Sequence, residues 1–175
     1  MQHRLIESVA EHPPDTQSTL LAFYALPHVS EPLRPIVIAA GTRAARALPE
    51  DEPNSLSSLI RWMAHVPPTE KLILAEEILL TVRKWLNEHH HFLSGDDRHV
   101  DQDLSQHQLS IASVLQYALR TLFPILAEDE VLALLAQVPL DWWDVQAEAL
   151  VRISPANRDK RLSQTLSLVQ QQPDE

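Results

Sequence analysis

The chain has 175 residues, and its 24 acidic and 14 basic side chains give a formal net charge of −10. It contains no Cys and only two Gly, which excludes disulfide scaffolds, thiolate metal sites and thiol catalysis and argues against glycine-rich phosphate loops. The acidic balance repels nucleic acid and anionic lipid surfaces on average, so we do not expect the protein to bind either directly.

Apolar residues recur with the helical period along nearly the whole chain, and no segment alternates like a strand. Pro residues and capping side chains punctuate this pattern. We expect seven or eight helices, drawn from these candidate segments: 2–11, 15–26, 32–48, 54–66, 68–91, 104–125, 128–138, 142–153 and 154–171.

Three of these segments carry a more specific pattern. Small side chains around Gly41 in segment 32–48 would let a neighbouring helix approach closely. Segment 68–91 is the longest, and its apolar face is so wide that we expect it at the centre of the fold, packed on two sides. Pro124 lies inside the pattern of 104–125, where we expect a kink or a break.

An apolar residue followed by Pro recurs between the expected helices, which favours antiparallel helix pairs joined by short turns. In rhythm alone the chain resembles the HEAT-type α-solenoids, which are built from helix pairs of about 40 residues. The sequence therefore predicts an all-α fold, either a short HEAT-like solenoid or an irregular helical bundle. We expect a single domain over 1–175; a sub-division into 1–93 and 104–172, joined by the charged linker 94–103, stays open.

The N-terminal residues MQHRLIESVAEHPP contain no long apolar run, so we expect no signal peptide. The longest apolar stretch in the chain, around 35–40, is far shorter than the roughly 20 residues that span a bilayer. We therefore expect a cytoplasmic protein with no membrane partner.

Side chains that can bind metal ions concentrate between residues 88 and 107, and imidazole and carboxylate groups suit zinc, iron, manganese or nickel. Glu88 and His91 stand three residues apart, so a continuous helix would place both on one face of its last turn. Asp96, Asp97 and His99 follow in an acidic loop and complete the candidate ligand set. A solvated acidic loop after a His-bearing helix C-terminus explains the same residues without a metal, and we expect no cofactor.

Trp142 and Trp143 point about 100° apart on a helix, so both cannot face one narrow core stripe. One of them is a candidate anchor for a partner, because Trp is enriched among binding hot spots; a broad buried face is the alternative. Arg152, Arg158 and Arg161 complete the predicted partner-binding set. A second basic group is expected on the solvated side of its helices: Arg34, Arg43, Arg46 and Arg61.

No Ser lies in a nucleophile elbow, and we assign no catalytic residue. The consistent helical framework favours a non-catalytic interaction or adaptor subunit that acts through a helical surface, with another protein as its partner. A homo-oligomer is left open. The alternatives are a metal-binding enzyme or metal sensor using segment 88–107, and a small helical subunit of a nucleic-acid-binding complex.

Overall fold

The computed structural model describes residues 16–94 and 106–171, and every regular element within these two ranges is helical. The all-α prediction is confirmed. The expected helix at 2–11 and the linker residues 95–103 lie outside the described residues. The elements are α2 (Thr16–Ala25), the 3-10 turns η1 (Leu26–His28) and η2 (Glu31–Leu33), α3 (Arg34–Arg46), α4 (Pro53–Met63), α5 (Pro68–Glu88), α6 (His90–Ser94), α7 (Gln106–Leu122), α8 (Glu128–Leu135), α9 (Trp143–Arg152) and α10 (Pro155–Gln171).

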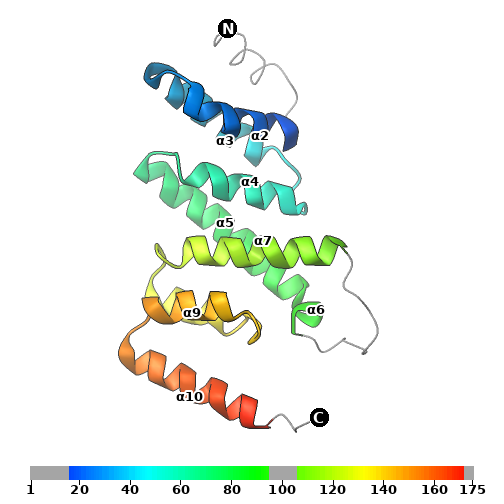
Figure 1. Ribbon diagram of the computed structural model, residues 1–175, viewed down its shortest axis with the longest axis vertical. Helices are drawn as coiled ribbons and strands as arrows, with labels where there is room; N and C mark the ends of the chain where they lie inside the picture. Colours follow the sequence, from blue (N-terminus) through cyan, green and yellow to red (C-terminus); the bar gives the residue numbers. More distant parts are fainter. Residues whose placement is uncertain (1–15, 95–105, 172–175) are drawn as a thin grey trace.

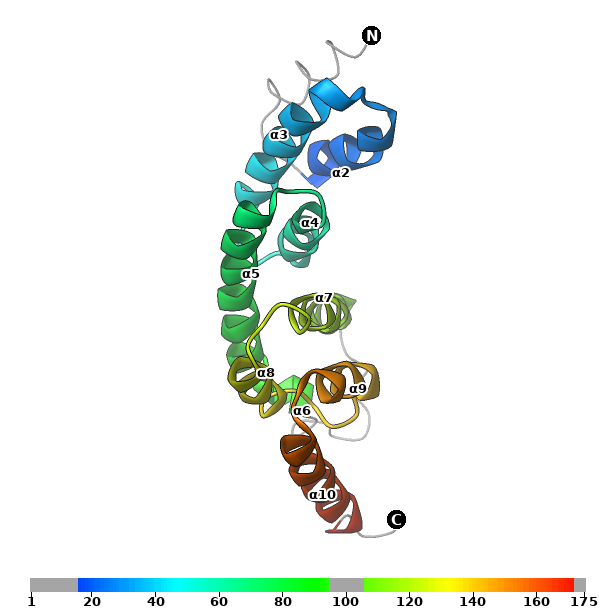
Figure 2. The same ribbon diagram turned by 90° about the vertical axis from the view of Figure 1, so that its left-hand side faces the viewer.

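The helices alternate between two layers of an elongated, curved stack (Figure 2). α3, α5 and α8 form the convex layer, and α2, α4, α7 and α9 form the concave layer. Within the concave layer each helix contacts the next one directly. The concave helices also run in a common direction, opposite to that of α3 and α5 (Figure 1).

The convex helices meet one another mainly through long side chains. Arg46 on α3 lies 3.6 Å from Glu70 and 2.9 Å from Glu77 on α5, and Arg83 on α5 lies 3.3 Å from Glu130 on α8. The helices of the concave layer therefore pack more closely than those of the convex layer, in agreement with the curvature of the stack. The more specific likeness to HEAT repeats stays a prediction.

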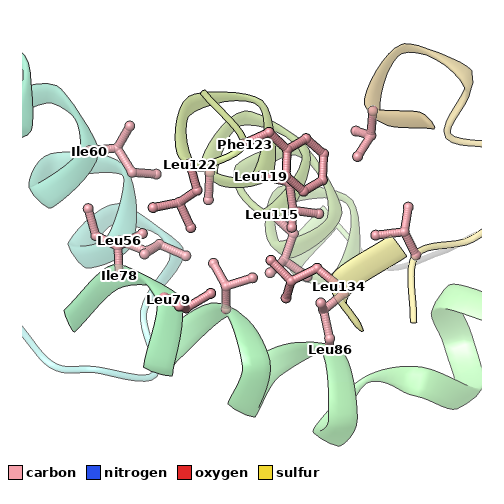
Figure 3. Close-up of a cluster of buried hydrophobic side chains, with 14 of the residues drawn as sticks. Leu56, Ile60, Ile78, Leu79, Leu86, Leu115, Leu119, Leu122, Phe123 and Leu134 are labelled. Atoms are coloured by element: carbon pink, nitrogen blue, oxygen red, sulfur yellow. The ribbon is translucent and has the colours of Figure 1, made fainter. Parts of the chain in front are cut away.

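The main core lies where α5 crosses under α4 and α7, as predicted for the longest helix (Figure 3). Leu56 and Ile60 of α4, Ile78 and Leu86 of α5, and Leu115 of α7 are all almost fully buried there. Each such side chain contributes about 1.5–3 kcal/mol through its burial. The core combines residues from both sides of the linker, because α4 and α5 precede it and α7, α8 and α9 follow it.

A second, smaller core joins α2, α3 and α4 around Trp62. Gly41 of α3 lies against the indole ring of Trp62, and Ala45 is buried one turn further along α3. The predicted close approach to the small residues of α3 is therefore confirmed. Phe23 of α2 packs edge-on against Trp62, with ring centroids 5.7 Å apart.

α4 begins at Pro53, and the hydroxyl of Ser55 in its first turn donates to the carbonyl of Pro49. One expected feature of the helices is wrong. The wide apolar face of α5 is not packed on both sides: Leu72, Ile73 and Leu80 are exposed. The convex layer has no further helix beyond α5 among the described residues, so this side of α5 faces solvent.

The helix boundaries otherwise follow the prolines. α7 ends at Leu122, two residues before Pro124, which confirms the break expected there. None of the helices in the described ranges has the length and hydropathy needed to cross a bilayer.

Candidate functional site

The predicted metal ligands do not form a cluster within the described residues. Glu88 is the last residue of α5 and His91 lies in the short α6, with the chain leaving helical geometry at His89 between them. Glu88 and His91, three residues apart, are therefore not in one continuous helix. They do not share a helix face as expected. Asp96, Asp97 and His99 lie outside the described residues. No group of three or more potential metal ligands is found in 16–94 and 106–171.

His89 is half-buried at the C-terminus of α5, where its ring packs edge-on against Trp85 with centroids 6.4 Å apart. Burial lowers the pKa of His89 below its ordinary value of 6.5. The charge of Glu88 opposes this shift, and His107 on α7 adds to it. These contacts give His89 a packing role at the junction of α5 and α7 and favour its neutral form.

The two adjacent tryptophans lie in different environments, because Trp142 precedes α9 with non-helical backbone angles and only Trp143 belongs to the helix. Trp142 is partly buried and packs against the main core, whereas Trp143, the first residue of α9, exposes 62% of its surface. Trp62 and Trp85 expose only 1% and 2%. Trp143 is therefore the tryptophan that is available to a partner.

The predicted partner-binding arginines divide between two environments. Arg152 is exposed and pairs with Glu148 one turn earlier on α9, at 3.1 Å. Arg158 donates to the carbonyls of Leu150 and Ile153, and Arg161 donates to the carbonyl of Leu135 at 2.9 Å. Arg158 and Arg161 thus attach α10 to the ends of α9 and α8, a structural role that the sequence pattern did not indicate.

A carboxylate completes this attachment of α10. Glu128, the first residue of α8, accepts hydrogen bonds from the backbone N–H and hydroxyl of Ser154 and from the amide of Asn157, at 2.7–2.9 Å. These hydrogen bonds, first from Asn157 and then from Ser154, lower the pKa of Glu128. Leu162 of α10 is 43% exposed.

The described surface includes the following two hollows. One, of about 420 Å³, opens on the convex side between α3, α4 and α5, where Arg46 and Glu77 pair at its edge and Leu80 and Lys84 form part of its wall. The other, of about 330 Å³, is a shallow groove between α4 and α7. Its lining is mostly small and polar: Pro53, Asn54, Ser57, Gln106, Leu109, Ser110, Ser113 and Val114.

The groove between α4 and α7 was missed by the sequence reasoning. Its residues are ordinary polar side chains on two helices separated by α5 and the linker, so no local motif marks them.

Comparison with protein-family models, with curated proteins and with solved structures finds no match for this chain.

Proposed function

We propose that this protein is a non-catalytic interaction or adaptor subunit that binds another protein through its helical surface. The proposal rests on the exposure of Trp143 at the start of α9. The other two tryptophans that lie within helices, Trp62 and Trp85, are buried. Exposing an indole ring to water is unfavourable, and binding hot spots are enriched in Trp that becomes buried in the complex.

The exposed face of α9 extends the apolar surface beyond Trp143. Ala147 and Val151 follow at intervals of four residues and are also exposed, so the three side chains lie along one side of the helix. Asp144, Glu148 and Arg152 run beside them. An apolar strip with a charged border is typical of a protein–protein contact, where a central anchor is surrounded by polar residues.

Two alternatives stay predictions. The metal alternative depends in part on Asp96, Asp97 and His99, which lie outside the described residues, so the structure does not test it. The nucleic-acid alternative depends on basic groups, and in one of these groups the guanidiniums of Arg158 and Arg161 hydrogen-bond to backbone carbonyls within the chain.

The test is native mass spectrometry of untagged protein purified from its own host, as the unmodified chain and as two variants. Trp143→Ala should lose the mass of a co-purifying polypeptide, whereas Leu80→Ala should retain it. Leu80 is the matched control, because it is a large apolar side chain of similar exposure on the opposite, convex layer. If the Trp143→Ala variant retains the partner, Trp143 does not contribute to binding it. If the unmodified chain has no partner, the proposal itself is wrong.

A further inference from the structure

The outward side of α5 carries a row of exposed side chains. They are spaced four residues apart and so form one ridge along the helix: Leu72, Glu76, Leu80, Lys84 and Glu88. Leu72 and Leu80 expose 61% and 66% of their surfaces, and no helix of the described residues covers this side of the convex layer (Figure 2). Exposed apolar side chains that lie close together mark interaction surfaces, and here charges interrupt them at regular intervals.

The two central charges of this ridge lie symmetrically about Leu80. Glu76 precedes Leu80 by one turn and Lys84 follows it by one turn. Neither Glu76 nor Lys84 forms an ion pair with another residue in 16–94 and 106–171, whereas α5 is joined to α3 and α8 by the ion pairs described above. The ridge therefore offers one acid and one base, both available, on either side of an exposed leucine.

We infer that this ridge of α5 binds the same ridge of a second copy of the chain, with the two Leu80 side chains in contact on a two-fold axis. The axis makes the two α5 helices antiparallel, so Glu76 of each copy lies opposite Lys84 of the other. When rows of this spacing pack into each other, the helix axes cross at about 50°. The contact is therefore centred on Leu80 and on the charges one turn away, and the helix ends diverge.

Charge complementarity selects this arrangement among the two-fold pairings of the ridge. An axis at Glu76 would set two carboxylates against each other, and an axis at Lys84 would do the same with two ammonium groups. An axis between Glu76 and Leu80 would place each leucine against a carboxylate. Parallel helices related by a two-fold axis would bring every charge against its own counterpart. Only the antiparallel pairing centred on Leu80 joins apolar to apolar and acid to base.

The charge of the surrounding layer also favours a second copy at this surface. α3 carries three basic and no acidic side chains, α5 carries three basic and four acidic, and α8 carries three acidic and no basic. The helices of the convex layer are thus close to neutral, although the whole chain has a net charge of −10. Two copies that meet through their convex layers therefore keep most of their negative charge apart.

Sedimentation velocity of the purified, untagged chain tests the inference. We expect the unmodified chain to pass from one copy to two as its concentration rises through the micromolar range, because a crossing of two helices is a small interface. Leu80→Asp should weaken this association at least tenfold, since it places two carboxylates on the axis. The control is Val151→Asp, which makes the same change on α9, at an apolar side chain that is 68% exposed; it should alter the association by less than about twofold.

A charge exchange tests the pairing itself. Glu76→Lys alone and Lys84→Glu alone should each weaken self-association at least tenfold, because each creates two like-charge contacts across the axis. A mixture of the two variants should associate again, because one copy then presents two cations and the other presents two carboxylates. Variants that had simply failed to fold would not associate on mixing, so this result separates a lost contact from a lost fold.

Four results would overturn the inference: a single copy at every concentration, assemblies larger than two copies, an equal effect of Leu80→Asp and Val151→Asp, or no association in the mixture. The inference goes beyond the proposed function and is independent of it, since the two surfaces lie on different layers. Trp143→Ala should lose the foreign polypeptide and keep the self-association, whereas Leu80→Asp should do the reverse. Loss of both in Leu80→Asp would show that the two surfaces are not separate, and would contradict the inference.

Discussion

Gly41 of α3 and the indole ring of Trp62 on α4 are packed so closely that a Cβ on Gly41 would stand 2.1 Å from Cζ2 of the ring. No side chain can occupy that position without a shift of α3 or of Trp62. The contact holds together α2, α3 and α4, because Trp62 also meets Phe23 from α2.

Gly41→Ala should therefore destabilise the protein. In a helix without this contact the same change would stabilise by about 0.5–1 kcal/mol, because Ala favours the helix more than Gly. Here overpacking against Trp62 should outweigh that gain and cost about 1–3 kcal/mol, measured as the free energy of unfolding in urea. Combining Gly41→Ala with Trp62→Leu should cost less than the sum of the two single changes. A stabilised Gly41→Ala variant would contradict the packing described here.

The exposure of Trp143 and the burial of Trp85 predict very different costs for the same substitution. Trp85→Ala should lose about 3–5 kcal/mol, since it opens a cavity in the main core. Trp143→Ala should change stability by no more than about 0.5 kcal/mol, since it removes no core contact. Thermal unfolding of the two variants side by side measures both. A large loss of stability in Trp143→Ala would show that this ring is part of the core.

The hydrogen bonds to Glu128 should make the attachment of α10 to α8 dependent on pH. Its pKa in the folded protein lies below the ordinary value of 4.5, because Asn157 and Ser154 hydrogen-bond to the carboxylate. The stabilisation is therefore fully present above pH 4.5 and is lost as the pH falls through the lowered pKa. Amide hydrogen exchange at the start of α10 should accelerate over that range, and Glu128→Gln should accelerate it already at neutral pH.

The control for this experiment is Asp129→Asn. It removes a neighbouring carboxylate in the same turn of α8, and Asp129 makes none of the hydrogen bonds to Ser154 and Asn157. Equal acceleration of exchange in both variants would assign the effect to the charge of α8 rather than to these bonds.

His89 should affect stability in a different range of pH. Burial lowers its pKa in the folded protein below the ordinary 6.5, so the unfolded chain binds a proton more readily. This contribution is complete above pH 6.5 and declines as the pH falls toward the lowered pKa. His89→Asn should flatten the dependence of the unfolding free energy on pH in that window, whereas His90→Asn, at an exposed neighbouring position, should leave its slope unchanged. An unchanged slope in His89→Asn would show that this ring is not the group that titrates.

The sequence by itself determined which segments are helical and where most of them are interrupted. Pro27, Pro49, Pro67, Pro124 and Pro139 each follow the end of a helix or lie in the turn after it, because a proline inside a helix removes a backbone donor and clashes with the preceding turn. The small residues of α3 likewise predicted that another helix packs closely against it. These are local effects, and local effects can be derived from residues a few positions apart.

Only the tertiary structure decided which faces of those helices are buried. Leu80 and Leu86 are alike in sequence, yet Leu86 meets the main core and Leu80 faces solvent, because no helix covers that side of α5 in the described residues. The hydrogen bond that the Ser154 hydroxyl donates to Glu128 joins residues 26 positions apart in the sequence. The groove between α4 and α7 likewise arises only when these two helices, distant in the chain, become neighbours. Such contacts depend on the order in which the helices stack, which no local pattern of residues specifies.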